Sequence, residues 1–288
     1  MPMRSSPTAR QLRFAAELRR MRERAGLSSA EAAGLLGIKP NQVSNMEAAR
    51  FGVSPERVRT LACHYDCADT ELIEALVAMT GERKGGWWEE YRELLPAGWL
   101  DLAELEHHAQ GLRDSITMHV PGLLQTPEHA REIFRQAVPA LSPPDVEHRV
   151  SFRVKRQRIL FGDTPTPYQA IIHEAGLRIA VGGPAIAQAQ LRHLLDMGER
   201  EHVTIRAIPF SAGAVPGSGQ SFYYAHGRVP QLDSVQLDQS HGVVFLDAES
   251  QLAKYRLLFE RIEAVSLPPD HTRDLIADIA RHLRKEAP

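Results

Sequence analysis

Hydrophobic positions in the N-terminal part of the chain recur at the spacing of a helix. In the first segment, 8–25, they stand at i, i+4, i+7 and i+11: Phe14, Leu18, Met21 and Ala25. Segments 54–65 and 69–79 repeat this pattern, with their apolar positions on one side of a helix. With two shorter helices inside 27–50, the pattern predicts an all-α head of five helices over residues 8–80.

The segment 27–50 carries the local signals of two short helices joined by a tight turn. Ser28 and Glu31 have the S-x-x-E spacing of a capping box, in which each side chain bonds to the other residue's backbone N–H. Gly37 ends the first helix, because glycine enters the left-handed conformation without a Cβ penalty. Pro40 stands at the first position of the second helix, where its missing N–H costs nothing. We therefore expect a helical hairpin here.

The second short helix separates apolar from polar positions. Val43 and Met46 lie three residues apart on one face. The opposite face carries four polar side chains: Asn41, Gln42, Ser44 and Asn45. Asn and Gln form paired hydrogen bonds with adenine in the major groove, and Ser contacts either partner of a base pair. This face suits DNA, but a hairpin with an ordinary polar surface has the same pattern, so the segment alone leaves both interpretations open.

The core of the hairpin has the pattern L-S-x-x-x-A, then glycine and a hydrophobic residue, then V-S-x-[hydrophobic]-E. The matching positions are Leu27, Ser28, Ala32, Ala33, Gly37, Ile38, Val43, Ser44, Met46 and Glu47. With this pattern, residues 8–80 resemble the lambda-repressor/Cro-like (Xre-type) helix–turn–helix domain. Two positions depart from the family: Ser29 stands where Gln is frequent, and Ala48-Ala49 replaces the glycine that often follows the Glu.

We expect a homodimer that places two copies of the 40–49 helix in successive major grooves of an inverted-repeat operator. Base contacts are predicted for the four polar residues of that helix. Phosphate contacts are predicted for four more residues: Arg13, Ser28, Lys39 and Arg50.

The charge distribution favours the same division of the chain. Residues 1–60 hold eleven Arg and Lys against five Asp and Glu, a net charge of +6, while the whole chain carries −2 and the remainder therefore −8. A basic head on an acidic body is typical of a protein in which one domain contacts phosphates. No run of about 18 apolar residues and no apolar signal core occur, so we expect no membrane span and a cytoplasmic, nucleoid-associated protein.

Glycine and charge without an apolar pattern predict a linker at 81–86, and the pattern then changes to a mixed α/β body over 87–288. Helices are expected at 87–96, 101–114, 128–138, 145–161, 184–198, 249–264 and 270–285. Short β-branched and aromatic runs predict strands at 168–173, 203–208, 221–225, 234–237 and 243–246. The helix at 184–198 lies between two of these strands, as in a βαβ unit.

An aromatic group opens the body. All three tryptophans of the chain fall within 87–99, together with a tyrosine: Trp87, Trp88, Tyr91 and Trp99. Aromatics this concentrated are either a brace of the body's core or a contact for a partner or a neighbouring domain. Both interpretations remain open at this point.

Several motifs follow one another along the body. They are Trp87-Trp88, 96–106, V-P-G-L-L-Q-T at 120–126, R-x-x-R-Q at 153–157, 174–178, Gln190-Leu191 and 208–213. In this order they resemble the C-terminal domain of WhiJ-type regulators of streptomycetes and related actinobacteria; His173 stands where an acid is frequent. The resemblance implies a regulator of developmental or secondary-metabolism type, commonly a repressor, with a small BldB-like partner protein encoded nearby. It implies no cofactor, and a small-molecule effector remains possible.

The catalytic motifs that this sequence approaches each lack a residue that defines them. His173-Glu174 begins an H-E-x-x-H zinc motif, but Leu177 replaces the second His. The glycine-rich loop around Ser218 lacks the Gly-Lys-Ser/Thr of a P-loop, and no G-x-S-x-G elbow occurs. Three further residues could meet in a cleft: His226, His241 and Asp247. We predict no catalytic, metal-binding or cofactor-binding residues; the alternative is a nucleotide or ester hydrolase that the head targets to DNA.

Overall fold

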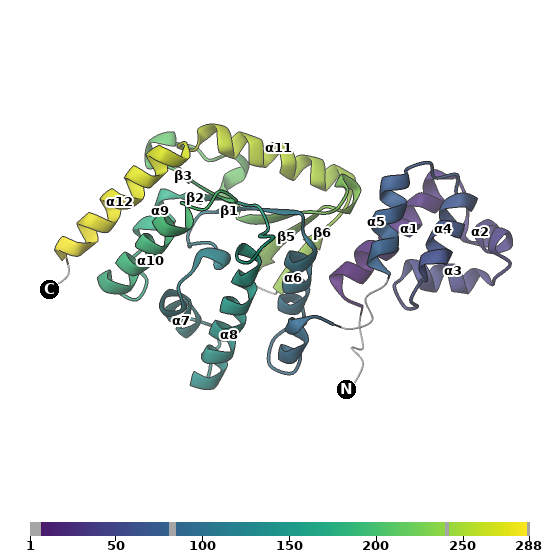
Figure 1. The fold of residues 1–288 in the computed structure, drawn as a ribbon, viewed down its shortest axis with the longest axis horizontal. Coiled ribbons are helices and arrows are strands. Elements are labelled where there is room, and N and C mark those ends of the chain that lie inside the picture. The colour runs from purple at the N-terminus through teal and green to yellow at the C-terminus, as the bar shows by residue number, and fades with distance from the viewer. Residues whose placement is uncertain (1–6, 81–84, 240–241, 287–288) are drawn as a thin grey trace. The chain divides into compact units, whose positions relative to one another are not determined.

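A computed structural model describes residues 7–80, 85–239 and 242–286. The chain divides into two compact units: unit 1 comprises Met1–Glu89 and His226–Asp233, and unit 2 comprises Glu90–Ala225 and Ser234–Pro288. Figure 1 shows the helices and strands of both units, and each unit has its own hydrophobic core. Residues 81–84 of the expected linker, and His241 among the cleft candidates, lie outside the described residues.

Unit 1 contains the predicted five helices. They are α1 (Ala9–Arg24), α2 (Ser29–Leu36), α3 (Pro40–Glu47), α4 (Pro55–His64) and α5 (Thr70–Met79). Each helix turns an apolar stripe inward, and Leu18, Val43 and Leu61 are all at most 2% exposed. The all-α head is therefore confirmed.

Local signals set the boundaries of these helices. Side-chain caps accept the backbone N–H three residues further on at the start of four helices: Thr8, Ser28, Ser54 and Asp69. Gly37 has φ 63° and ends α2, while the N–H of Ile38 bonds back to the carbonyl oxygen of Ala33 at 3.0 Å. This Schellman turn directs the chain from α2 into α3.

Unit 2 is built on a six-stranded mixed sheet. Its strands are β1 (Gly111–Ile116), β2 (Tyr168–His173), β3 (Val203–Ile208), β4 (Phe222–His226), β5 (Ser234–Gln239) and β6 (Gly242–Leu246). They lie in the order β3-β2-β1-β4-β5-β6. The pairs β1–β2 and β2–β3 are parallel, whereas β4–β5 and β5–β6 are antiparallel. One edge of the sheet is therefore β3 and the other is β6.

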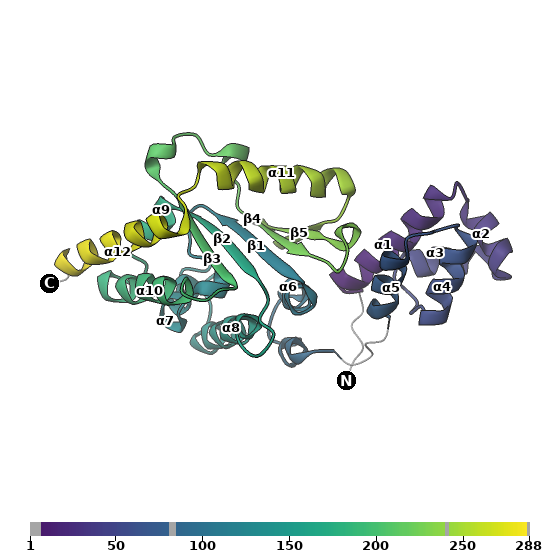
Figure 2. The same cartoon turned by 45° about the horizontal axis from the view of Figure 1, so that its top comes forward.

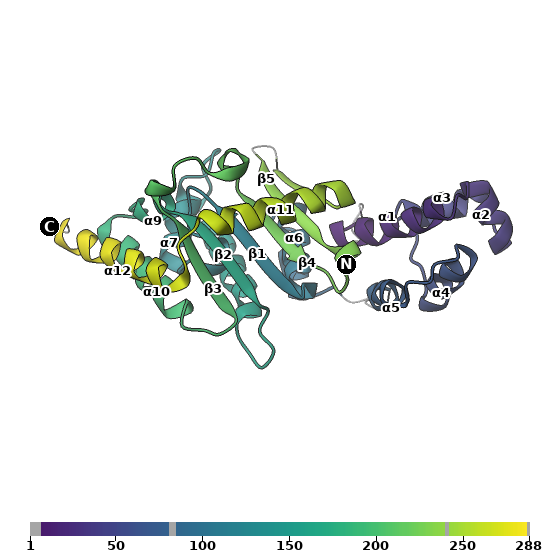
Figure 3. The ribbon, with the colours of Figure 1, turned by 90° about the horizontal axis from the view of Figure 1, so that it is seen from above.

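Helices cover both faces of this sheet (Figures 2 and 3). They are α6 (Ala97–His108), α7 (Pro127–Arg135), α8 (Pro143–Arg156), α9 (Glu174–Arg178), α10 (Pro184–Met197), α11 (Glu249–Val265) and α12 (Pro269–Glu286). On one face, Phe259 of α11 packs in a cluster with Tyr224 and Val235 of the sheet. On the other face, Leu191 of α10 and Ile279 of α12 belong to the largest core cluster. The mixed α/β body is therefore confirmed. It has three layers, with the sheet between two layers of helices.

The predicted βαβ unit is present, since α10 joins the parallel strands β2 and β3. The helix expected at 101–114 is wrong at its end, because α6 stops at His108 and β1 follows. Leu112 lies seven residues after Leu105, a spacing that also fits a helix. In the structure Leu112 instead pairs with Tyr168 as part of a strand. The helix expected at 87–96 is likewise shorter, a 3₁₀ turn over Trp87–Tyr91.

Candidate DNA interface

Helices α2 and α3 form the predicted hairpin, and α3 has two different faces. Val43 is 1% exposed and packs in the core of unit 1. On the other side of α3, Asn41, Gln42 and Ser44 are exposed and Asn45 is half-buried. The structure thus brings the four predicted base-contact residues onto one accessible side, as a helix in the major groove requires.

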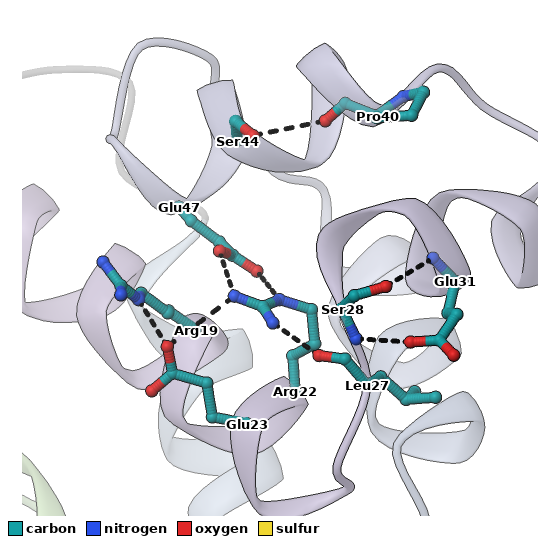
Figure 4. A network of polar contacts seen from close by, with 9 residues as sticks. All are labelled: Arg19, Arg22, Glu23, Leu27, Ser28, Glu31, Pro40, Ser44 and Glu47. Atoms are coloured by element: carbon teal, nitrogen blue, oxygen red, sulfur yellow. Dashed lines mark hydrogen bonds and ion pairs between the residues drawn. The ribbon is translucent and has the colours of Figure 1, made fainter.

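A buried ion pair holds α3 against α1 (Figure 4). Arg22 Nε lies 2.6 Å from Glu47 Oε1 and Arg22 Nη2 lies 2.9 Å from Glu47 Oε2, so the guanidinium donates two parallel bonds to the carboxylate. Arg22 Nη1 also donates to the carbonyl oxygen of Leu27 at 2.6 Å, just before α2. Because the two side chains are only 8% and 9% exposed, this pair fixes α3 relative to α1 and to the start of α2.

The same pair changes the acid–base properties around it. The hydrogen bonds that the Arg22 guanidinium donates to Glu47 raise the pKa of Arg22 above its ordinary value. Burial, with the negative charge of Glu47, raises the pKa of the Tyr65 phenol to about 12. Arg22 therefore stays charged and Tyr65 stays neutral at physiological pH. The sequence pattern identified Glu47, but Arg22 stands 25 residues earlier and gave no signal of its own.

Three of the base-contact candidates have local partners in the free protein. Gln42 Oε1 accepts the backbone N–H of Lys39 at 3.1 Å, which caps α3. Ser44 Oγ donates to a carbonyl oxygen one turn earlier at 3.3 Å. Asn45 Oδ1 accepts from Arg50 Nη1 at 3.3 Å. Exposed bonds of this kind contribute little net free energy, so a base edge can replace them.

Three predicted phosphate-contact residues surround this face. Ser28, Lys39 and Arg50 are exposed, and they stand at the start of α2, the start of α3 and beyond the end of α3. Ser28 Oγ accepts the N–H of Glu31 at 3.2 Å as the cap of α2. The Ser28 hydroxyl also bonds to the Glu31 carboxylate and lowers its pKa, so a phosphate oxygen that accepts from Ser28 takes the place of that bond.

Arg13 does not share this arrangement, and its prediction needs correction. Its side chain is 6% exposed and lies 3.5 Å from the carboxylate of Glu17 in the same helix. Glu17 is itself 1% exposed and also pairs with Arg20 at 3.1 Å and Arg24 at 3.2 Å. A buried side chain cannot reach a phosphate, so the prediction of Arg13 as a phosphate contact is wrong. The i, i+4 spacing of Arg13 and Glu17 was a signal for this pairing.

The chain leaves α3 through a residue in the left-handed conformation. Ala49 has φ 55°, and its N–H donates to the carbonyl oxygen of Met46 at 3.1 Å. The N–H of Arg50 donates to the carbonyl oxygen of Asn45 at 2.9 Å, which completes a Schellman motif. The exit that the family makes with glycine is therefore made here by alanine, with strain of about 1 kcal/mol.

Ala49→Gly is expected to stabilise unit 1 by about 1 kcal/mol, because glycine adopts this conformation without a Cβ penalty. Chemical unfolding followed by circular dichroism measures the change. Ala48→Gly is the matched control: Ala48 has φ −101°, so glycine there only adds freedom to the unfolded chain and lowers stability. Equal effects of the two substitutions would contradict the assignment of strain to Ala49.

In unit 2, the motif residues bond to one another. Arg153 Nη1 donates to Gln125 Oε1 at 2.6 Å, and Gln157 Nε2 donates to the carbonyl oxygen of Gln125 at 2.6 Å. Gln190 of α10 makes two more bonds to the backbone of segment 120–126, at 2.7 and 2.8 Å. These motifs form one network that fastens the segment between α8 and α10, which gives them a structural role.

Unit 2 also contains charges inside its core. Glu106 is 1% exposed and accepts two bonds from Arg156, at 2.6 and 2.8 Å, and one from the hydroxyl of Tyr223 at 3.0 Å. Asp114 is 7% exposed and accepts a bond from the hydroxyl of Tyr168 at 3.2 Å. Burial raises the pKa of the Asp114 carboxyl to about 7, although the Tyr168 bond opposes this. Asp114 is therefore partly protonated at neutral pH.

The aromatic group packs inward at three of its four positions. The rings of Tyr91 and Trp99 lie 5.1 and 6.1 Å from the ring of Phe152 in α8. Both therefore brace the core of unit 2. Trp87 and Trp88 meet edge to face at 6.0 Å, and Trp88 is 4% exposed.

The pair His173-Glu174 has structural partners. Glu174 is 6% exposed; its Oε1 accepts from Arg178 Nε at 2.7 Å and its Oε2 accepts the N–H of Phe210 at 2.8 Å. His173 Nδ1 accepts a backbone N–H at 3.2 Å and caps α9. These bonds connect α9 to the segment after β3.

The hairpin, its buried ion pair and its polar face define a helix–turn–helix protein, and this class indicates a DNA-binding regulator rather than an enzyme. Residues 13–76 match the family described as "Helix-turn-helix domain", and residues 99–278 match the family described as "Domain of unknown function (DUF5753)". The second match covers more than half of the chain, which therefore belongs to the DUF5753 family. No curated protein and no solved structure matches the chain. In the described ranges, no helix is both long and apolar enough to cross a bilayer.

Proposed function

We propose that this protein is a sequence-specific transcriptional regulator, a repressor that binds an inverted-repeat operator as a homodimer. One observation carries the proposal: α3 is locked to α1 by the Arg22–Glu47 pair and keeps its polar side accessible. Docking of a helix into the major groove needs both a fixed orientation and donors and acceptors at the surface. The basic charge of residues 1–60 supports the approach to phosphates.

In the proposed complex, Gln42 and Asn45 read base edges, helped by Asn41 and Ser44. Three exposed residues around them hold phosphates: Ser28, Lys39 and Arg50. The two α3 helices of the dimer lie about 34 Å apart, one turn of DNA, so the half-sites have the same spacing.

The body is proposed to control this binding. The resemblance to WhiJ-type regulators supports a regulatory role for unit 2, which contains most of the residues that match the DUF5753 family. A small BldB-like partner protein or a small-molecule effector is proposed to bind there and to change the spacing or release of the two heads. Of the aromatic group, Trp87 remains the proposed partner or interdomain contact, because Trp88 is buried and Tyr91 and Trp99 pack against Phe152.

Gln42→Ala is expected to weaken operator binding by about 1–3 kcal/mol and to relax base preference at one position of each half-site. Binding to a panel of single-base operator variants measures both effects. Because Gln42 also caps α3, Gln42→Glu is the control: it keeps an acceptor for the Lys39 N–H but cannot make the paired contact with adenine. Arg50→Ala should instead weaken all sequences alike. Unchanged base preference in both Gln42 variants would refute the assignment of α3.

A further inference from the structure

Strand β6 forms one edge of the sheet in unit 2. It pairs with β5 from Gln239↔Gly242 to Val235↔Leu246. Within the part of the chain that the structure describes, no hydrogen bond joins its backbone to any element other than β5. Its sequence, G-V-V-F-L, lacks the Lys and Pro residues that commonly protect sheet edges. The strand therefore offers a row of backbone donors and acceptors.

The opposite edge of the sheet is closed by the chain itself. The N–H of Leu267 donates to the carbonyl oxygen of Ala207 in β3 at 2.8 Å, and the N–H of Ala207 donates to Thr272 Oγ1 at 2.9 Å. Arg206 Nε adds a bond to Ser266 Oγ at 2.8 Å. The connection between α11 and α12 thus occupies the β3 edge, and β6 is the edge that can accept another strand.

We propose that β6 is the dimerisation surface: the β6 strands of two copies of this chain pair antiparallel and join their sheets across a two-fold axis. The inference rests on the proposed function, because an inverted repeat is read by two heads related by a two-fold axis. Two identical strands that pair antiparallel have this symmetry, and donors on one copy meet acceptors on the other. The axis passes beside Val244, the middle residue of the five-residue strand.

The occupant of this edge is a second copy rather than a different partner strand. Self-pairing satisfies the symmetry of the DNA site without a further component. A five-residue strand gives an interface at the small end of the range for proteins, so the free dimer is weak and DNA that binds both heads strengthens it.

Substitution of Val244 tests the pairing in the full chain. Val244→Lys and Val244→Glu each place like charges opposite one another at the axis, which disfavours pairing. Thr204→Lys, in the opposite edge strand β3, is the matched control. Sedimentation velocity should show a dimer dissociation constant raised at least tenfold in either Val244 variant, restored in their equal mixture, and unchanged in Thr204→Lys. Rescue by the mixture cannot come from a folding defect.

A cross-link provides a second measurement. In a chain with Cys63→Ser and Cys67→Ser, Val244→Cys should form an intermolecular disulfide under mild oxidation, because directly opposed residues bring their Cα atoms within bonding range. Thr204→Cys should not. A wild-type chain that is monomeric at all concentrations, or a Val244→Cys chain that does not cross-link, would overturn the assignment of β6.

DNA-binding measurements distinguish a failure of the proposed β6 dimer from a failure of the proposed function. Val244→Lys should bind a half-site duplex as the wild type does and lose its cooperative binding to the inverted repeat. If Val244→Lys still binds the inverted repeat cooperatively, β6 is not the dimer surface although the regulatory function stands. If the wild-type chain binds neither duplex, the proposed function itself fails.

Discussion

Glu47→Ala is expected to release α3 from α1 and to abolish DNA binding. The substitution leaves the guanidinium of Arg22 buried without its bidentate partner, and loss of one member of a buried pair costs about 3–5 kcal/mol. Hydrogen exchange should show loss of protection in α1 and α3, while the amides of the sheet in unit 2 keep theirs. Chemical unfolding measures the free energy directly.

Two controls isolate the cause of this effect. Glu74→Ala removes the pair with Arg59, whose side chains are 60% and 50% exposed, and should cost at most about 1 kcal/mol. Replacing both Arg22 and Glu47 by methionine removes the charges together, and should recover much of the stability because no buried charge remains unpaired. Protection of α3 that is unchanged in Glu47→Ala would show that the ion pair does not fix the recognition helix.

Asp114→Asn is expected to stabilise unit 2 increasingly as pH rises from about 4 to about 7. The pKa of Asp114 rises from the ordinary value of 3.8 to about 7 in the folded protein, so the folded state binds the proton more tightly. The stability that this protonated carboxyl contributes is complete below pH 4 and is lost as pH rises through 7. The difference of about three pKa units corresponds to about 4 kcal/mol at most.

The measurement is chemical unfolding of wild type and Asp114→Asn at a series of pH values. The amide does not titrate, so the difference in free energy of unfolding should grow with pH and become constant above about pH 8. Asp163→Asn, at an exposed acid, is the control for replacing a carboxylate by an amide at the surface. A difference that is independent of pH would mean that Asp114 is not the buried acid that titrates in this range.

Local signals predicted most of the fold. The cap Ser28 and the turn at Gly37 place helix ends from a few neighbouring residues, because capping depends only on local hydrogen bonds. The β-branched runs predicted five strands, and among the strands of the described residues β1 was missed. Its segment contains Leu112 at a spacing that fits a helix as well as a strand, and the pairing with β2 that decides between them involves residues far along the chain.

The candidate site was predicted less completely. Tertiary ion pairs decide which charged side chains are buried and which remain exposed. Asn41, Gln42, Ser44 and Asn45 lie where the helical period places them. Arg13 has the same composition signal as the exposed Arg50, but a buried Glu17 lies one turn away and pairs with it. The pairing of Arg22 with Glu47 and the burial of Asp114 depend on contacts between distant segments, which periodicity does not report.

Selection of bound duplexes from a random pool by the chain of 288 residues tests the central claim most directly. We expect an inverted repeat with half-sites about 34 Å apart, an affinity that falls steeply with salt because phosphate contacts release counterions, and a changed base preference in Gln42→Ala. Recovery of no common sequence, or binding that is independent of salt, would contradict the assignment of this protein as a sequence-specific DNA-binding regulator.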